Sequence, residues 1–230
     1  MESDFSSSTI AGPTQRADDF LLKSTSQIMK VNWWGQYWPS NTPQAQDDFT
    51  LRIFGDSGGA PSPSALFQFS PGDLGRADTG IDSFGIRVYA YSALLPSPVT
   101  LQGNTTYWLS IVNNTISDID DNWFWQRVTR FSGTVQQRAT DTNLWTTFSP
   151  STMAFNIEGV VVPQLGISSA GHLMVSAPIG STNRIEYISD LRMTNWQTLT
   201  NVVIQLAPLE LIIPEFAQAP QRFYRQVLLQ

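Results

Sequence analysis

The sequence predicts an all-β protein, with a jelly-roll-like β-sandwich followed by a small immunoglobulin/fibronectin III-like β-sandwich. Apolar and polar residues alternate with a period of two in many short stretches, as half-buried strands do. Clusters of Gly, Pro, Asn and Asp separate these stretches, and no window of useful length has the periodicity of an amphipathic helix. We assign residues 1–16 to an N-terminal segment, residues 17–162 to the first sandwich and residues 163–230 to the second.

The clearest strand of the first sandwich is Asp47–Asp56, where Phe49, Leu51 and Ile53 alternate with polar residues. Gly103-Asn104 predicts a tight hairpin between the strands on either side. Other stretches of the same kind are expected to form strands. They are Gln27–Trp38, Ala65–Ser70, Ile86–Ala93, Pro98–Gln102, Thr105–Asn113, Asn122–Val128 and Ala154–Val162.

The second sandwich begins after Val162, where a strand ends at Pro163 and a fresh set of strands starts near Gly166. A module of this length can fold alone but has a small core, so docking against the first sandwich would help it. Its expected strands are Gly166–Ala177, Arg184–Asp190, Trp196–Gln205, Leu209–Pro214 and Gln221–Leu229.

An aromatic block, Val31–Trp38, lies in the first sandwich. Because successive side chains of a strand point to opposite faces, the block divides into two sets. We expect Val31, Trp33 and Tyr37 to point inward, and Trp34 and Trp38 to point outward. Gly35 shares the inward parity, where its missing side chain leaves room for a neighbour's ring or a bend in the strand.

Composition excludes several classes of function. The formal net charge is −6 and there is no cysteine. We therefore expect no nucleic-acid partner and no binding to an anionic membrane, and thiolate metal sites and disulfides are excluded. No apolar run reaches the ~18 residues of a membrane helix, so no membrane insertion is expected. Low charge with abundant Ser, Thr, Asn and Gln favours an extracellular or cell-surface location, with the signal peptide absent from this sequence.

The order of motifs over about residues 17–162 resembles a β-sandwich module of secreted and surface proteins of environmental bacteria, often ones with PEP-CTERM sorting tails. The motifs are Ala17-Asp18-Asp19-Phe20, Trp33-Trp34-Gly35-Gln36-Tyr37, Asp48–Phe54, Pro98–Leu101, Thr106–Ile111 and Met153-Ala154-Phe155. The remainder resembles a short fibronectin type III-like module, through Arg184–Tyr187, Asp190-Leu191, Trp196–Leu199 and Gln221–Arg225. Neither resemblance implies an activity.

Residues for catalysis are scarce. The chain has one histidine, His172, so a Ser-His-Asp triad could draw on only one imidazole base. A glycosidase needs two carboxyl groups that face each other, and Glu2 and Glu158 are the only glutamates before residue 163. We expect no enzyme activity and no required cofactor; a pair of aspartates is the alternative that the sequence leaves open.

Calcium is the one candidate ion. The loop from Asp118 to Asn122 places oxygen-bearing side chains at Asp118, Asp120 and Asn122, spaced as in the first positions of an EF-hand. The pattern then fails, since Trp123 and Thr129 replace the required Gly and Glu. A looser Ca²⁺ site at Asp118, Asp120 and Asn122 is one interpretation, and a solvated acidic turn is the other. The acid pairs Asp18-Asp19 and Asp47-Asp48 are each expected to point one member inward.

Carbohydrate binding is the sharpest functional hypothesis. Aromatic faces stack on the apolar faces of sugar rings, and the candidates are Trp34, Trp38, Trp123 and Trp125. The competing interpretation is that these rings fill the core, where each removes about 150–250 Å² from water.

We therefore expect a non-catalytic extracellular module that binds a polysaccharide or another surface polymer or surface protein. The alternative is a structural subunit of an extracellular matrix, coat or filament. Such a homo-oligomer would assemble through sheet edges or the N-terminal segment.

Overall fold

The computed structural model describes residues 1–4, 13–116, 121–128, 133–213 and 221–229. All regular elements in these ranges are β-strands, and no helix there could cross a membrane. The all-β prediction is confirmed. The chain divides into two compact units. The first is Met1–Leu21, Ile28–Val99 and Thr105–Glu158, and the second is Leu22–Gln27, Thr100–Asn104 and Gly159–Gln230.

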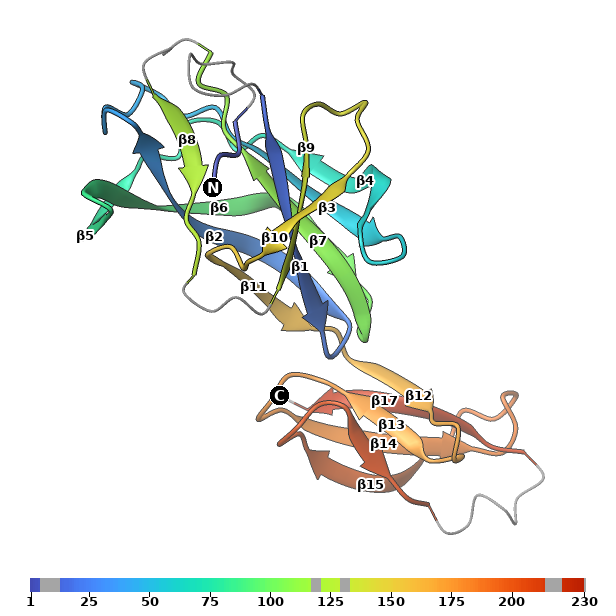
Figure 1. The fold of residues 1–230 in the computed structure, drawn as a ribbon. Helices are drawn as coiled ribbons and strands as arrows, with labels where there is room; N and C mark the ends of the chain where they lie inside the picture. Colours follow the sequence, from blue (N-terminus) through green and yellow to red (C-terminus); the bar gives the residue numbers. More distant parts are fainter. Residues whose placement is uncertain (5–12, 117–120, 129–132, 214–220, 230) are drawn as a thin grey trace. The chain divides into compact units, whose positions relative to one another are not determined.

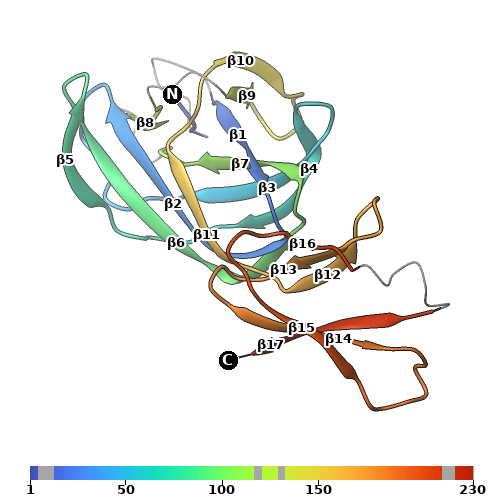
Figure 2. The same cartoon turned by 90° about the horizontal axis from the view of Figure 1, so that it is seen from below.

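The first unit is a sandwich of two sheets, drawn as separate layers in Figure 2. Its larger sheet has the order β10-β9-β1-β7-β3-β4. These strands are β10 (Thr146–Pro150), β9 (Thr134–Arg138), β1 (Gln15–Leu22), β7 (Thr105–Val112), β3 (Thr50–Asp56) and β4 (Pro61–Phe69). The other sheet has the order β11-β2-β6-β5, with β8 also paired to β2 (Figure 1). Its strands are β11 (Phe155–Val161), β2 (Ser26–Trp38), β6 (Ile86–Leu101), β5 (Ala77–Ser83) and β8 (Asn122–Trp125).

Alternation in the sequence explains which side chains the two sheets enclose. Leu51 and Ile53 of β3 are fully buried, as predicted. An aromatic cluster occupies the space between the sheets: Trp33 stacks on Tyr91 with 5.5 Å between centroids, and Phe49 contacts Trp33 edge-on at 5.1 Å. Such aromatic pairs add about 0.5–1.5 kcal/mol beyond the area they bury.

The N-terminal segment differs from the prediction, because its described residues belong to the first sandwich. Asp4 is fully buried and pairs with Thr14 and Asn113 through the backbone. Its carboxylate accepts hydrogen bonds from Thr115 Oγ1 (2.9 Å) and from the backbone N–H of Trp123 (2.8 Å). Burial of this carboxylate is compensated by donors more than 100 residues away in sequence, which a local pattern cannot indicate.

The Gly103-Asn104 turn is present, but the predicted hairpin is wrong. The strands that it joins, β6 and β7, belong to different sheets. Asn104 has a φ of 54°, as a tight turn requires. The turn residues thus predicted correctly that the chain reverses direction here. Which strands pair depends instead on the burial of side chains between the two sheets.

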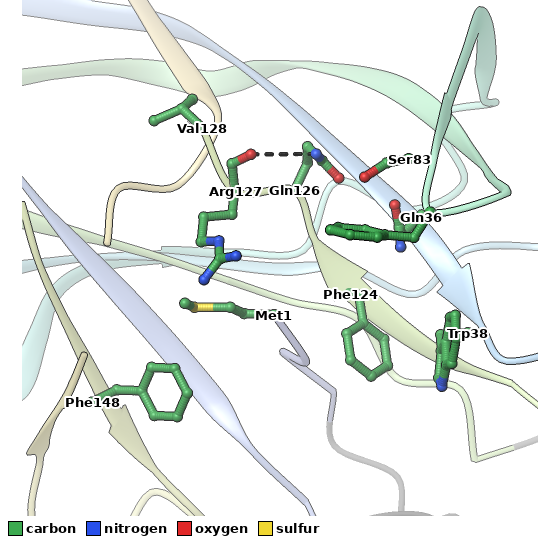
Figure 3. Close-up of a pocket in the computed structure, with 10 residues that line it drawn as sticks. Met1, Gln36, Trp38, Ser83, Phe124, Gln126, Arg127, Val128 and Phe148 are labelled. Atoms are coloured by element: carbon green, nitrogen blue, oxygen red, sulfur yellow. Dashed lines mark hydrogen bonds between the residues drawn. The ribbon is translucent and has the colours of Figure 1, made fainter. Parts of the chain in front are cut away.

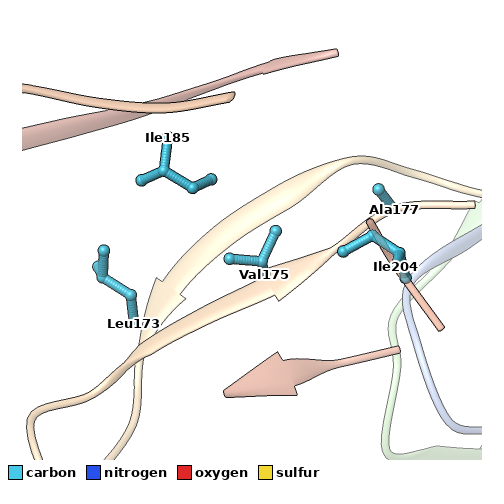
Figure 4. Close-up of a cluster of buried hydrophobic side chains, with 5 residues drawn as sticks. All are labelled: Leu173, Val175, Ala177, Ile185 and Ile204. Carbon is cyan, nitrogen blue, oxygen red and sulfur yellow. The ribbon is translucent and has the colours of Figure 1, made fainter. Parts of the chain in front are cut away.

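The second unit contains two three-stranded sheets. One has the order β12-β13-β16, made of β12 (Gln164–Ile167), β13 (Leu173–Ser176) and β16 (Leu209–Leu211). The other has the order β15-β14-β17, made of β15 (Gln197–Val203), β14 (Thr182–Ile188) and β17 (Phe223–Leu229). Figure 4 shows its small core of Leu173, Val175, Ala177, Ile185 and Ile204.

The boundary between the units differs slightly from the predicted one at residue 162. The second unit begins at Gly159 and also includes the turns Leu22–Gln27 and Thr100–Asn104. Backbone hydrogen bonds hold these pieces together, from Val162 N to Thr25 O (2.9 Å) and from Asn104 N to Leu22 O (2.6 Å). Contacts distant in sequence therefore place two hairpin-like turns in the second unit.

Candidate functional site

The outer face of β2 presents the candidate residues Trp34 and Trp38. Val31, Trp33 and Tyr37 are fully buried, whereas Trp38 is 38% exposed and Trp34 is half-buried. The predicted division of the aromatic block is therefore confirmed. Asn32 and Gln36 share the outer parity, so tryptophans and carboxamides alternate along this face.

The other two predicted binding residues, Trp123 and Trp125, lie in the core instead. Both are 0% exposed, so neither can offer a face to a ligand. Trp123 packs edge-on against Phe49 at 5.1 Å, and Trp125 donates from its indole N–H to the carbonyl of Ala154 (3.0 Å). A period of two shows that the faces of a strand alternate, but it does not say which face is inside.

Phe124, between these tryptophans, is the aromatic residue that β8 turns outward. It is half-buried and lies opposite Gln36 in the pairing of β8 with β2. Together with Trp38 it lines a cavity of about 880 Å³, which we call the Trp38 groove. The groove is also lined by Gln36, Phe84, Gln126, Arg127 and Phe148, and Figure 3 draws Trp38 and Phe124 among the lining residues.

Phe84 is a groove residue that the sequence analysis missed. It is 90% exposed at the tip of the β5–β6 hairpin, whose register pairs Ser83 with Ile86. Phe84 has a φ of 55° and Gly85 a φ of 79°, so both turn residues have left-handed backbones. That conformation suits Asn or Gly and is strained for a bulky side chain. A Phe-Gly pair between two strands is the signal that could have revealed it.

Phe148 forms another wall of the groove. It is 36% exposed, and the guanidinium carbon of Arg16 lies 4.0 Å from its ring centroid. This cation–π contact restrains the orientation of the ring from behind.

The acidic loop predicted to hold calcium has a structural role where it is described. Asp118 and Asp120 lie outside the described residues. Asn122 is buried and donates from its side chain to the carboxylate of Glu2. The Asp121 carboxylate accepts hydrogen bonds from the backbone N–H groups of Ser40 (2.5 Å) and Thr42 (2.6 Å). It therefore holds the turn that directly follows Trp38.

One member of each predicted acid pair does point inward. Asp18 and Asp47 are buried, whereas Asp19 and Asp48 are exposed. Burial raises the pKa of Asp47, and Asn113 donates to its carboxylate at 3.0 Å. Within the described ranges, no three Asp, Glu or His side chains gather in a way that could hold a metal ion.

Trp34 lines a second cavity of about 580 Å³, which we call the Trp34 hollow. Asn32, Asn156, Glu158 and Arg76 line it too. The Glu158 carboxylate accepts from Asn32 Nδ2 (2.6 Å) and from Lys30 Nζ (3.2 Å), and these hydrogen bonds lower its pKa. The structure thus places Trp34 and Trp38 in two hollows rather than on one flat surface.

Comparisons with known proteins found no match among curated proteins and none among solved structures. A family model described as a domain of unknown function, DUF7901, matches residues 3–168. This match covers all of the first unit except Met1 and Glu2, the lining of both hollows except Met1, and part of the second unit. The chain therefore belongs to the DUF7901 family.

Proposed function

We propose that the first unit is a non-catalytic carbohydrate-binding module and that the Trp38 groove is its binding site. One observation carries the proposal: Trp38 and Phe124 line a cavity of sugar-binding dimensions next to the carboxamides of Gln36 and Gln126. Pockets of about 300–1,000 Å³ are typical of small-molecule sites.

The chemistry of the groove suits a sugar. The C–H faces of a pyranose ring are apolar and pack on aromatic faces, whose electron-rich surface attracts the C–H groups. Sugar hydroxyls both donate and accept, as carboxamides do, so Gln36 and Gln126 provide directional partners of matching character.

The groove is held in shape before any ligand arrives. Trp38 follows the buried Tyr37 on β2, and Asp121 ties down the turn beyond it. Phe124 lies between the fully buried Trp123 and Trp125. A preformed site loses less conformational entropy on binding, which favours affinity. The composition of the chain supports an extracellular or cell-surface location as part of this proposal.

A glycan array followed by titration calorimetry tests the proposal on the full chain. We expect binding to a restricted set of glycans, and we expect Trp38→Ala and Phe124→Ala to weaken it. Phe67→Ala is the matched control, because Phe67 is also 38% exposed but lies on β4 in the other sheet. Flat binding across a broad panel, or equal affinity for Trp38→Ala, would contradict the proposal.

A structural or assembly role is the competing proposal, and one observation favours it. β4 ends the order of the larger sheet and carries Leu66 and Phe67, which are 52% and 38% exposed. An exposed apolar edge strand can pair with another chain. Light scattering of the wild type and of Phe67→Lys distinguishes the roles, since only assembly through this edge predicts a smaller molar mass for the variant.

A further inference from the structure

We infer that the Trp38 groove and the Trp34 hollow form one binding track along β2, which holds a neutral, linear polysaccharide in an extended conformation. The inference rests on the proposed function and deepens it, because it names the shape and charge of the ligand. It also adds Trp34 and Asn156 to the site.

The alternation of β2 supplies the first side of the track. Asn32, Trp34, Gln36 and Trp38 point to the same face of the sheet. The two tryptophans are four positions apart in the strand, which corresponds to about 13 Å at a rise of about 3.3 Å per residue. A ligand that reaches both rings must therefore be extended along the strand and longer than a single sugar.

Two strands in succession supply the second side. β8 pairs with the end of β2, where Gln36 lies opposite Phe124. Nearer the start of β2, its neighbour on this side is β11 (Figure 1). The two meet at Trp34. Its carbonyl accepts from Gln126 N (2.8 Å), and its N–H donates to Ala154 O (3.4 Å).

This junction joins the two hollows. Gln126 lines the Trp38 groove and is bonded through its backbone to Trp34, which lines the other hollow. Ala154 N donates to Gln126 O (2.8 Å), so the segment after Ala154 lies next to the end of the segment that contains Gln126. Asn156 and Glu158 therefore line the track beyond the part that Phe124 and Gln126 line.

Gln36, midway between the tryptophans, has an unmet hydrogen-bonding capacity. Its side chain is only 8% exposed, yet its Oε1 is buried without a hydrogen-bond partner among the described residues. An orphaned buried acceptor is costly, and each native example needs an explanation. Because Gln36 lines the groove, a rotation of its carboxamide toward the cavity would bring this oxygen to a sugar hydroxyl between Trp34 and Trp38.

The charges around the track favour a neutral ligand. Glu158 is already engaged by Lys30 and Asn32. Arg76, at the rim of the Trp34 hollow, lies 3.5 Å from the Asp47 carboxylate and donates to the carbonyl of Gln44 (2.5 Å). A charged polymer would have to compete with these internal pairs, whereas a neutral glycan can use the aromatic faces, the carboxamides and, in the Trp38 groove, the N–H groups of Arg127.

Titration calorimetry of the full chain with neutral linear oligosaccharides tests the track. The probes are cello-, xylo-, manno- and malto-oligosaccharides, each from disaccharide to hexasaccharide. Affinity for the recognised series is expected to rise with length. Trp34→Ala and Trp38→Ala are each expected to lower the affinity for the hexasaccharide about tenfold, a usual loss when an aromatic hot-spot residue is removed. A disaccharide, which covers one hollow, should lose affinity in only one of the two variants.

Three further variants separate binding from folding. Trp34→Tyr keeps a stacking ring and should restore most of the affinity lost in Trp34→Ala. Asn156→Ala changes an exposed side chain beside Trp34 and should weaken only the longer ligands. Phe67→Ala should bind as the wild type does.

The outcomes separate this inference from the proposed function. If Trp38→Ala weakens binding while Trp34→Ala and Asn156→Ala leave hexasaccharide affinity unchanged, the Trp38 groove stands and the track is overturned. Preference for charged oligosaccharides, such as oligogalacturonate, overturns the neutral class. If no glycan binds, or if an extended peptide binds instead, both proposals fall.

Discussion

The indole ring of Trp123 on β8 occupies the space in which a side chain at Gly35 on β2 would stand. A Cβ atom built at Gly35 would collide with the Cε2, Cζ2 and Nε1 atoms of Trp123. Gly35 is inward-facing on β2, and Trp123 is fully buried against Phe49 and Tyr91. The missing side chain of Gly35 is therefore what allows the tryptophan of β8 into the core, and it leaves Phe124 as the residue that β8 turns outward.

Replacing Gly35 with alanine is expected to destabilise the first unit. The added methyl group must displace a buried ring that has little free space around it, and overpacking of this kind costs about 1–3 kcal/mol. Urea denaturation followed by tryptophan fluorescence measures the loss. Gly55→Ala is the control, because a Cβ there meets its nearest neighbour, Leu66, at an ordinary 3.7 Å. Equal losses in the two variants would contradict this account of Gly35.

Replacing Phe84 with asparagine is expected to stabilise the protein and weaken glycan binding. A left-handed backbone costs a bulky residue about 1–2 kcal/mol, and asparagine tolerates it at the first position of a two-residue hairpin turn. Thermal unfolding and calorimetric titration of the same sample measure both effects. Phe84→Tyr keeps the ring and should retain the affinity and stability of the wild type. If Phe84→Asn gains stability and keeps full affinity, Phe84 plays no part in binding.

Asp18 should make the stability of the first unit depend on pH. Burial raises the pKa of Asp18 to about 7, from an ordinary value of 3.8, although Met153 N donates to its carboxylate at 2.7 Å. Between about pH 4 and pH 7, Asp18 is therefore protonated in the folded state and ionised in the unfolded state. The free energy of unfolding therefore falls as the pH rises from about 4 to about 7, by on the order of 4 kcal/mol from this group.

The variant Asp18→Asn cannot titrate and isolates this effect. The difference in unfolding free energy between the wild type and Asp18→Asn is expected to change through that pH range and to be constant above it. Subtracting the variant removes the contributions of Asp47 and Glu2, whose pKa values burial also raises. A difference that does not vary between pH 4 and pH 7 would show that Asp18 titrates normally.

The second unit should respond to pH in the opposite direction. Glu186 is 4% exposed, and its carboxylate accepts from Arg225 Nε (2.6 Å) and pairs with Arg184 Nε (2.7 Å). The hydrogen bond from Arg225 lowers the pKa of Glu186 below its ordinary 4.5. Stability from this cluster is present above that value and is lost as the pH falls below it.

Hydrogen exchange at the amides of β14 and β17 reads out this cluster locally. Glu186→Gln should speed exchange there at neutral pH, because it removes the charge that both arginines face. Glu210→Gln is the control in the same unit; its exposed carboxylate pairs with His172 at the edge of the other sheet. If exchange is unchanged in Glu186→Gln, the ion pairs do not stabilise this sheet. Its stability would then come from packing, which includes the stacking of the Arg225 guanidinium on the Trp196 ring at 4.4 Å.

The candidate site was partly predictable. Trp34 and Trp38 were predicted to lie on the face opposite Val31, Trp33 and Tyr37, and both line hollows. The same reasoning chose Trp123 and Trp125, which are buried, and passed over Phe124. β8 has only four residues, so its alternation gives no clue to which parity faces the core, and its pairing with β2 decided the matter.

The sequence by itself determined the β class, the division of Val31–Trp38 into two faces, and the turn at Gly103-Asn104. These features depend on the local alternation of side chains and on turn residues, which neighbouring positions specify. Only the tertiary structure decided that β6 and β7 separate into different sheets and that Asp4 lies in the core. It also decided that Phe84 joins the Trp38 groove. Each of these depends on partners far apart in the chain, because the free energy of a sandwich comes from burying two faces against each other.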